Sequence, residues 1–278
     1  MTTRRTQIIR PPSLSLGILK DDLARLISYR DLLLILALHR IRVRYRQSAL
    51  GYTWAVLQPV LMVAIYTLVF TLFAKVPTGK TPYVVFAFSA LIPWLYFSNG
   101  LSLATNGLVN NPSLVLKVHF PREILPLSYL AAAFVDFVIG SAVLAVTMAI
   151  YRVPAHETLL WVLVLMIVAS IFLTGASLLC SAVQVKYRDV GLAMPFVLQL
   201  WMFATPVLYA LHSVPARLRP YYTLNPMVAV VDGFRSAVIL GSRPDLHLLM
   251  RSFTISIALL VFSYVWFKRS EATFADEM

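Results

Sequence analysis

Long uncharged apolar runs recur along this chain, and the first of them, from Trp54 to Ala74, extends for 21 residues. A transmembrane helix needs about 20 consecutive apolar residues to cross a hydrocarbon core about 30 Å thick. Strands of membrane barrels are shorter, about ten residues with alternating hydrophobicity. Because only 13% of the residues are charged and the mean hydropathy is +0.78, a soluble domain is excluded. We therefore predict an all-α polytopic membrane protein.

Six transmembrane helices are expected from these runs. An interfacial amphipathic helix with a basic segment should precede them, and short re-entrant helices on the outside should separate spans five and six, since the apolar pieces there are too short to cross. The expected divisions are a cytoplasmic tail 1–20, the interfacial and basic segment 21–46, a membrane domain 47–267 with spans at about 54–74, 83–107, 124–151, 158–185, 190–211 and 246–267, and a cytoplasmic tail 268–278.

The basic residues set the orientation. Four arginines directly precede the first span: Arg40, Arg42, Arg44 and Arg46. Each would cost about 2.5–3.5 kcal/mol at the centre of a membrane helix, so all four must stay on one aqueous side, which the positive-inside rule makes the cytoplasm. With both termini inside, the inner segments hold sixteen basic residues and the outer segments seven. The net charge of +12 is therefore attributed to anionic lipid headgroups as partners, with no nucleic acid.

The loop between spans two and three combines prolines with charged residues. It reads NNPSLVLKVHFPREILP and predicts a short cytoplasmic helix bounded by prolines. Its candidate functional residues are Asn111, Lys117, His119, Arg122 and Glu123.

Asp136 lies near the middle of the expected third span. An ionisable residue there is a functional hypothesis by default. The alternative, a structural hydrogen bond to Ser, Thr or Asn on a neighbouring span, is favoured, because a proton-coupled transporter would be expected to carry several such acids.

Enzymatic groupings are not evident in the sequence. Cys180 is the single cysteine, and there is no paired-carboxylate, Ser/His/Asp or metal-binding pattern. Residues 74–81, AKVPTGKT, satisfy a relaxed phosphate-loop pattern, but they join two spans on the outside, without the strand and helix that such a loop requires. We expect no catalytic site, metal or cofactor in this chain.

Aromatic side chains gather on one face of span one and one face of span five. Such faces beside polar groups suit stacking on sugar rings, although helix packing and lipid contact are the simpler explanation. The candidate channel-lining residues are Tyr66, Phe70, Phe73, Phe196, Gln199 and Phe203.

Four motifs, in this order, carry a family resemblance. They are RVRYRQSALGYTWAVLQP, FPREILPLS, VKYRDVGLAMPFVLQLWMFATPVLY and LNPMVAVVDGFR. Together they resemble the ABC-2 type permeases that export polysaccharides, including O-antigen, capsule and teichoic acid exporters. The resemblance covers nearly the whole chain, and it specifies the family more strongly than the substrate.

The resemblance implies the permease subunit of an exporter that carries a lipid-linked glycan across the bacterial inner membrane. It implies a homodimer of six-span subunits with two copies of a separate ATPase chain, which would hold the ATP and Mg. The proline-bounded loop would couple to that ATPase. The basic segment would lie at the entrance. In a helix Arg40 and Arg44 lie on one side and Arg42 and Arg46 on the other, so one face would be toward headgroups and the other toward the ATPase or a pyrophosphate-linked substrate.

Three other functions compete with this interpretation. One is an ABC-2 exporter of a drug or small lipid, which deletion would distinguish by leaving surface polysaccharide intact. Another is a membrane-embedded transferase acting on polyprenyl lipids, for which a catalytic grouping should be visible. The last is a membrane scaffold, which would depend on no ATPase.

Overall fold

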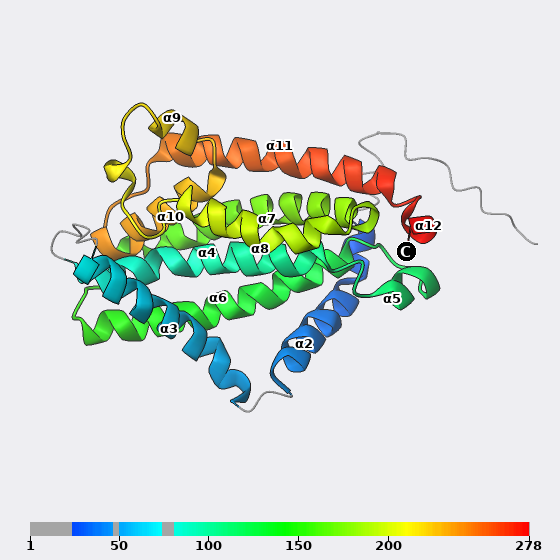
Figure 1. The fold of residues 1–278 in the computed structure, drawn as a ribbon, viewed down its shortest axis with the longest axis horizontal. Helices are drawn as coiled ribbons and strands as arrows, with labels where there is room; N and C mark the ends of the chain where they lie inside the picture. Colours follow the sequence, from blue (N-terminus) through cyan, green and yellow to red (C-terminus); the bar gives the residue numbers. More distant parts are fainter. Residues whose placement is uncertain (1–23, 47–49, 74–80, 278) are drawn as a thin grey trace, which may run out of the picture.

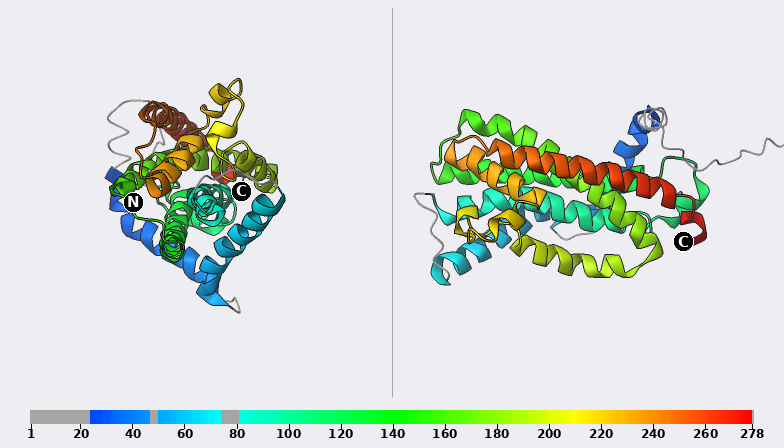
Figure 2. Two further views of the ribbon diagram at one scale, coloured as in Figure 1. Left: turned by 90° about the vertical axis from the view of Figure 1, so that its left-hand side faces the viewer. Right: turned by 90° about the horizontal axis from the view of Figure 1, so that it is seen from above.

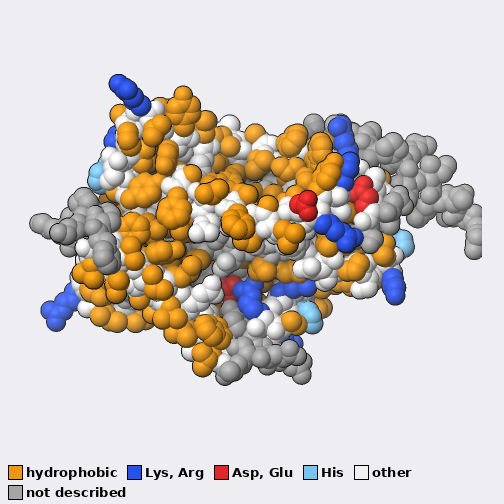
Figure 3. Space-filling model, viewed as in Figure 1, with side chains coloured by type: hydrophobic (Ala, Val, Ile, Leu, Met, Phe, Trp, Pro, Cys, Tyr) orange, Lys and Arg blue, Asp and Glu red, His pale blue; other side chains and the backbone are white. Residues whose placement is uncertain are grey.

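The computed structural model describes residues 24–46, 50–73 and 81–277, and these ranges contain helices and connecting turns but no strand. The predicted all-α class is therefore confirmed. The long helices lie side by side along one axis (Figure 1). The side chains on the viewed face are hydrophobic over most of the middle of this bundle, and charged groups gather toward its right-hand end (Figure 3).

Five stretches are long and apolar enough to cross a membrane, and each agrees with a predicted span to within a few residues. The 3₁₀ turn η1 (Gly51–Thr53), α3 (Trp54–Leu68) and the π-helical η2 (Val69–Phe73) form the first, and α4 (Tyr83–Thr105) and α6 (Ile124–Ile150) follow. The 3₁₀ helix η3 (Glu157–Leu160) continues into α7 (Trp161–Lys186), and α11 (Leu246–Ser270) is the last.

The expected fifth span is shorter than predicted. Its helix α8 (Asp189–Phe203) has 15 residues, about 22 Å, which is less than a hydrocarbon core of about 30 Å. The expected end lay at Leu211, but Pro206 disfavours helical backbone at Thr205 and the chain turns there. The predicted count of six spans is therefore not confirmed.

Helix α4 forms the centre of the bundle. The end-on view places it among the other helices (Figure 2), and 83% of its most apolar stretch is buried, compared with 11% for the first span. Helices α7 and α11 pack closely at Gly175, where an added Cβ would lie 3.0 Å from the Leu260 Cα. A glycine at this position therefore permits the close backbone approach.

Short helices connect α8 to α11, in agreement with the short helices expected there. The 3₁₀ helix η4 (Leu211–Ser213) and α9 (Arg219–Tyr222) precede α10 (Pro226–Arg235) and the π-helical η5 (Ser236–Leu240). The buried Arg235 donates hydrogen bonds to the carbonyls of Pro206, Val207 and Tyr209. The guanidinium thus pairs with backbone carbonyls of the non-helical turn that follows α8.

Both ends of the described chain pack near the short α5 (Pro112–Lys117) at one end of the bundle (Figure 1). Helix α2 (Arg30–Arg46) packs along α6, and residues 24–28 are also helical. The predicted tail 1–20 and the start of the interfacial helix at 21 lie outside the described residues. The expected tail 268–278 is partly helical, because α11 continues to Ser270 and α12 (Phe274–Glu277) follows.

Candidate functional site

The expected coupling loop contains one exposed tip. Helix α5 begins at Pro112. Proline has no backbone N–H, but the N–H groups of the first helical turn have no acceptor within the helix, so proline is tolerated there. Val115 is buried and fixes the helix to the bundle, whereas Leu116, Lys117, Val118 and His119 are exposed. A partner protein can therefore reach the end of α5 and the two residues after it. The predicted short helix is present, although it ends at Lys117, well before the second proline.

Asn111 lies at the base of this tip and bonds within the chain. Its side-chain amide donates to the Gly107 carbonyl at 2.7 Å, and its oxygen accepts from Arg40 Nη2 at 3.0 Å. The Arg40 guanidinium also lies over the Tyr129 ring, 4.2 Å from its centroid. Asn111 thus ties α5 to α2 and α6.

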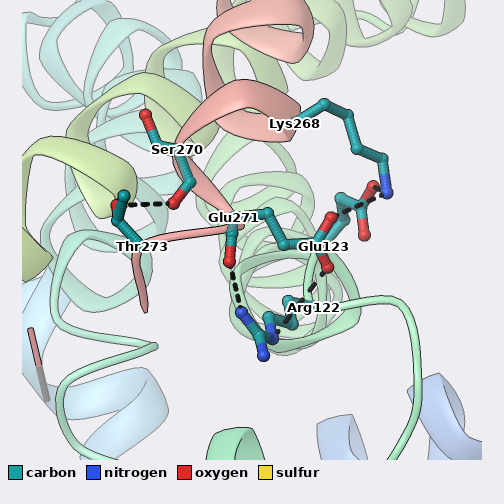
Figure 4. Close-up of polar contacts among 6 residues, drawn as sticks. All are labelled: Arg122, Glu123, Lys268, Ser270, Glu271 and Thr273. Carbon is teal, nitrogen blue, oxygen red and sulfur yellow. Dashed lines mark hydrogen bonds and ion pairs between the residues drawn. The ribbon is translucent and has the colours of Figure 1, made fainter. Parts of the chain in front are cut away.

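Arg122 and Glu123, also predicted to serve coupling, form a charged cluster with the end of α11 (Figure 4). Arg122 Nη1 donates to the Glu271 carbonyl at 2.6 Å, and Lys268 Nζ pairs with the Glu123 carboxylate. Lys268 Nζ also lies 3.2 Å from Glu271 Oε2. We call Arg122, Glu123, Lys268 and Glu271 the loop clamp. It joins the coupling loop to the last long helix.

Burial makes the loop clamp a positioning element. The Glu123 side chain is only 2% exposed, and burial raises the pKa of its carboxyl while Lys268 partly opposes that effect. Behind the cluster, Phe274 packs edge-on against Phe267 at 5.4 Å between ring centroids. Glu123 is therefore inaccessible to a partner. Of the five predicted coupling residues, Lys117 and His119 offer exposed side chains.

The predicted entrance arginines divide as the helical spacing indicates. Arg40 and Arg44 both face the bundle, where Arg44 forms an ion pair with Asp136, and Arg42 is exposed. The Arg46 side chain lies outside the described residues. The favoured expectation for Asp136 was a Ser, Thr or Asn partner. The structure places the Arg44 guanidinium beside the Asp136 carboxylate, so an arginine of α2 is an ion-pair partner of this acid.

Of the aromatic candidates on the first span, Tyr66 and Phe70 pack inward. Tyr66 Oη lies 3.9 Å from Met202 Sδ, and Phe70 stacks on Tyr83 with ring centroids 5.9 Å apart. The Phe73 side chain lies outside the described residues.

The candidates on α8 point differently. Phe196, Gln199 and Phe203 are exposed, Phe196 to 73%. The structure therefore does not bring the two aromatic sets together on one surface of the described chain.

Sequence reasoning missed the partners of several charged residues. Lys268 and Glu271 were assigned to a cytoplasmic tail, and Arg235 to a loop with short helices. Lys268 and Glu271 stand three apart, a spacing that places both on one helix face. That signal is local and carries no information about Glu123, 145 positions earlier.

The described residues bear on a possible metal site, but hardly on the phosphate-loop pattern. Within 24–46, 50–73 and 81–277, no group of three or more His, Cys, Asp or Glu side chains is placed to hold a metal ion. The relaxed phosphate-loop pattern at 74–81 lies almost wholly outside the described residues.

Comparison with known proteins identifies relatives along most of the chain. The family model described as "ABC-2 type transporter" matches residues 31–239. The chain is 30% identical over 256 residues to the O-antigen export system permease protein RfbA of Myxococcus xanthus, covering 91% of this chain and 97% of that protein. It is 27% identical over 247 residues to the protein of the same name from Klebsiella pneumoniae, covering 88% and 94%. It is 26% identical over 215 residues to the polysialic acid transport protein KpsM of Escherichia coli, covering 74% and 80%.

Proposed function

This chain belongs to the ABC-2 type transporter family, and we infer that it is the permease subunit of an ATP-driven exporter of a lipid-linked polysaccharide, of the O-antigen, capsule or teichoic acid type. The observation that carries this inference is the match over nearly its full length to O-antigen export permeases, joined by capsule-type relatives such as KpsM. The five candidate spans, together with the bacterial export-permease relatives, indicate a multi-pass protein of the bacterial inner membrane.

We further propose the arrangement that the family resemblance implies. Two copies of the chain pair as a homodimer, and α8 with the turn after it serves as the sixth membrane element. Two copies of a separate ATPase chain hold the ATP and Mg, so hydrolysis does not occur in this subunit. Both termini face the cytoplasm, which the excess of basic residues on that side favours.

The exposed end of α5 is proposed as the ATPase contact. Leu116 and Val118 supply apolar surface, and Lys117 and His119 supply polar contacts at the rim. The loop clamp connects the base of this contact to α6 and α11. A push on α5 would therefore reach two long helices through packed and ion-paired groups, as a rigid-body movement requires.

Co-purification tests this assignment. The permease is expressed in its native host, purified through a tag on the permease in mild detergent, and assayed for a stoichiometric second subunit. Replacing Leu116 and Lys117 with Asp should remove the ATPase while the permease remains monodisperse, since a charge would enter the contact. The same pair of Asp residues at Lys186 and Tyr187, which are also exposed, is the matched control with the same change of charge.

Undiminished ATPase recovery with the α5 variant would exclude this contact. An exporter of a drug or small lipid would pass the same test, so surface polysaccharide must be measured in a deletion strain. A polyprenyl-lipid transferase would instead be active without any ATPase.

A further inference from the structure

The buried side chain of Gln184, on the last turn of α7, bonds two other helices. Its Oε1 accepts from the backbone N–H of Gly191 in α8, and its Nε2 donates to Asn106 Oδ1 at the end of α4, at 3.1 Å. The residue is only 3% exposed. One side chain thus uses both ends of its amide to join α4, α7 and α8. We call Asn106, Gln184 and Gly191 the amide joint.

The start of α8 depends on this contact. The first N–H groups of a helix have no acceptor within the helix, and the cap residue Arg188 supplies no side-chain acceptor. Gln184 supplies one from the end of α7, by accepting from Gly191 in the first turn of α8. This hydrogen bond satisfies a backbone group that would otherwise lack a partner. The amide joint therefore fixes the first turn of α8 to the ends of α4 and α7.

Gly191 permits the three helices to meet this closely. An added Cβ at this position would lie 2.6 Å from Gln184 Nε2 and would overlap Asn106 Oδ1. Any larger residue would therefore have to displace both amides. Glycine is otherwise unfavourable inside a helix, so the close contact accounts for its presence here.

The turn that begins at Asn106 leads directly to α5. Within it, the Asn110 N–H donates to the Asn106 carbonyl at 2.9 Å, and the Asn111 N–H donates to the Leu108 carbonyl at 3.0 Å. Leu108 is fully buried, and α5 begins immediately after Asn111. A displacement of α5 would therefore reach Asn106 through a turn that is both hydrogen-bonded and packed.

Helix α8 is free to move on one side. It begins at the α5 end of the bundle (Figure 1). On its open face, Leu192, Phe196 and Leu200 are 78%, 73% and 73% exposed. Its buried residues are apolar: Met194, Leu198 and Met202. Apolar helix faces can slide past one another by small amounts, so the hydrogen bonds at the start of α8 decide which neighbour it follows.

We propose that the amide joint passes the movement of α5 to α8, so that ATP binding by the partner ATPase shifts the helix that carries Phe196, Gln199 and Phe203. Gln184 is then a positioning residue for export. This inference rests on the proposed function, in which α5 contacts the ATPase. It adds a route from the coupling loop to α8, beside the route through the loop clamp to α6 and α11.

Measuring ATP hydrolysis and export on the same variants tests the proposal. Gln184→Met keeps the length of the side chain and loses both hydrogen bonds. In a deletion strain it should restore about tenfold less surface polysaccharide than the wild type, the effect of losing two neutral hydrogen bonds. The complex purified from the same cells should retain its ATPase subunit and its rate of ATP hydrolysis. That separation of hydrolysis from export would not arise from a loss of folded protein.

Further variants connect the defect to the amide joint. Gly191→Ala should reduce export in the same way, whereas Gly140→Ala is the matched control, because its added Cβ would have its nearest neighbour at 3.6 Å, an ordinary contact. Ser181→Ala removes a buried hydrogen bond within α7 alone and should export normally. Adding Asn106→Leu to Gln184→Met should cause no further loss, since both changes break the same joint.

Normal export by Gln184→Met and Gly191→Ala, beside an ATPase that co-purifies with the wild type, would overturn this inference alone. Export and ATP hydrolysis that fall together with the yield of folded permease would also overturn it, because that pattern shows a merely structural contact. A wild-type permease that purifies without any ATPase would overturn the proposed function and this inference with it.

Discussion

Removing Lys268 from the loop clamp should destabilise the protein, because it leaves a buried carboxylate without its cation. The Glu123 side chain is 2% exposed and that of Lys268 17%, so neither group is well solvated. Breaking a buried ion pair from one side costs about 3–5 kcal/mol, and the partial exposure of Lys268 favours the lower value, about 3 kcal/mol. A chain of this size loses about 2–4 °C of thermal midpoint per kcal/mol. Lys268→Met should therefore lower the midpoint by about 6–12 °C.

The assay is thermal unfolding of the purified permease, followed by intrinsic tryptophan fluorescence in one detergent at one protein concentration. Lys117→Met, at an exposed position, is the matched control and should be almost neutral. The double variant Glu123→Gln with Lys268→Met should recover most of the loss, since it removes the buried charge together with its partner. A Lys268→Met midpoint equal to that of the control would refute the reasoning, as would a double variant no more stable than the single one.

Three further outcomes follow from other contacts. Arg44→Gln should lower the thermal midpoint more than Arg42→Gln, because only Arg44 pairs with a carboxylate of α6, and equal effects would contradict that role. Gly175→Val should disrupt assembly of the bundle, measured as aggregation on size exclusion, because its Cβ alone would lie 3.0 Å from the backbone of Leu260; a monodisperse variant would count against the close packing. The raised pKa of the Glu123 carboxyl means that the native state binds its proton more tightly than the unfolded state does. As pH falls through this raised pKa toward 4.5, the thermal midpoint of the wild type should therefore rise relative to that of Glu123→Gln. A parallel pH dependence of the two midpoints would argue against the burial effect.

The spans were predictable because hydrocarbon length constrains the sequence directly. Each of the five long helices falls on a long apolar run, interrupted within the predicted spans only by Asp136 and Arg251, and α4, α6 and α11 begin at the predicted residues. Helical spacing also separated Arg40 and Arg44 from Arg42 correctly. Both successes depend on local rules, namely helix rise and helix periodicity.

The remaining features depend on contacts between distant parts of the chain. The short α8 is followed by carbonyls that accept hydrogen bonds from Arg235, and Arg44, which pairs with Asp136, is 92 positions away from it. Glu123 was predicted to meet a partner protein and is instead covered by Lys268. A single sequence gives the charge of such residues but not what faces them, so their roles could not be assigned from it.

The most direct test of the central claim is the surface polysaccharide of the bacterial host after deletion of this gene. We predict loss of the glycan from the cell surface, accumulation of its lipid-linked form in the inner membrane, and restoration by the wild-type gene but not by the α5 variant with Asp at Leu116 and Lys117. An unchanged surface polysaccharide, with no lipid-linked glycan accumulating inside, would contradict the account.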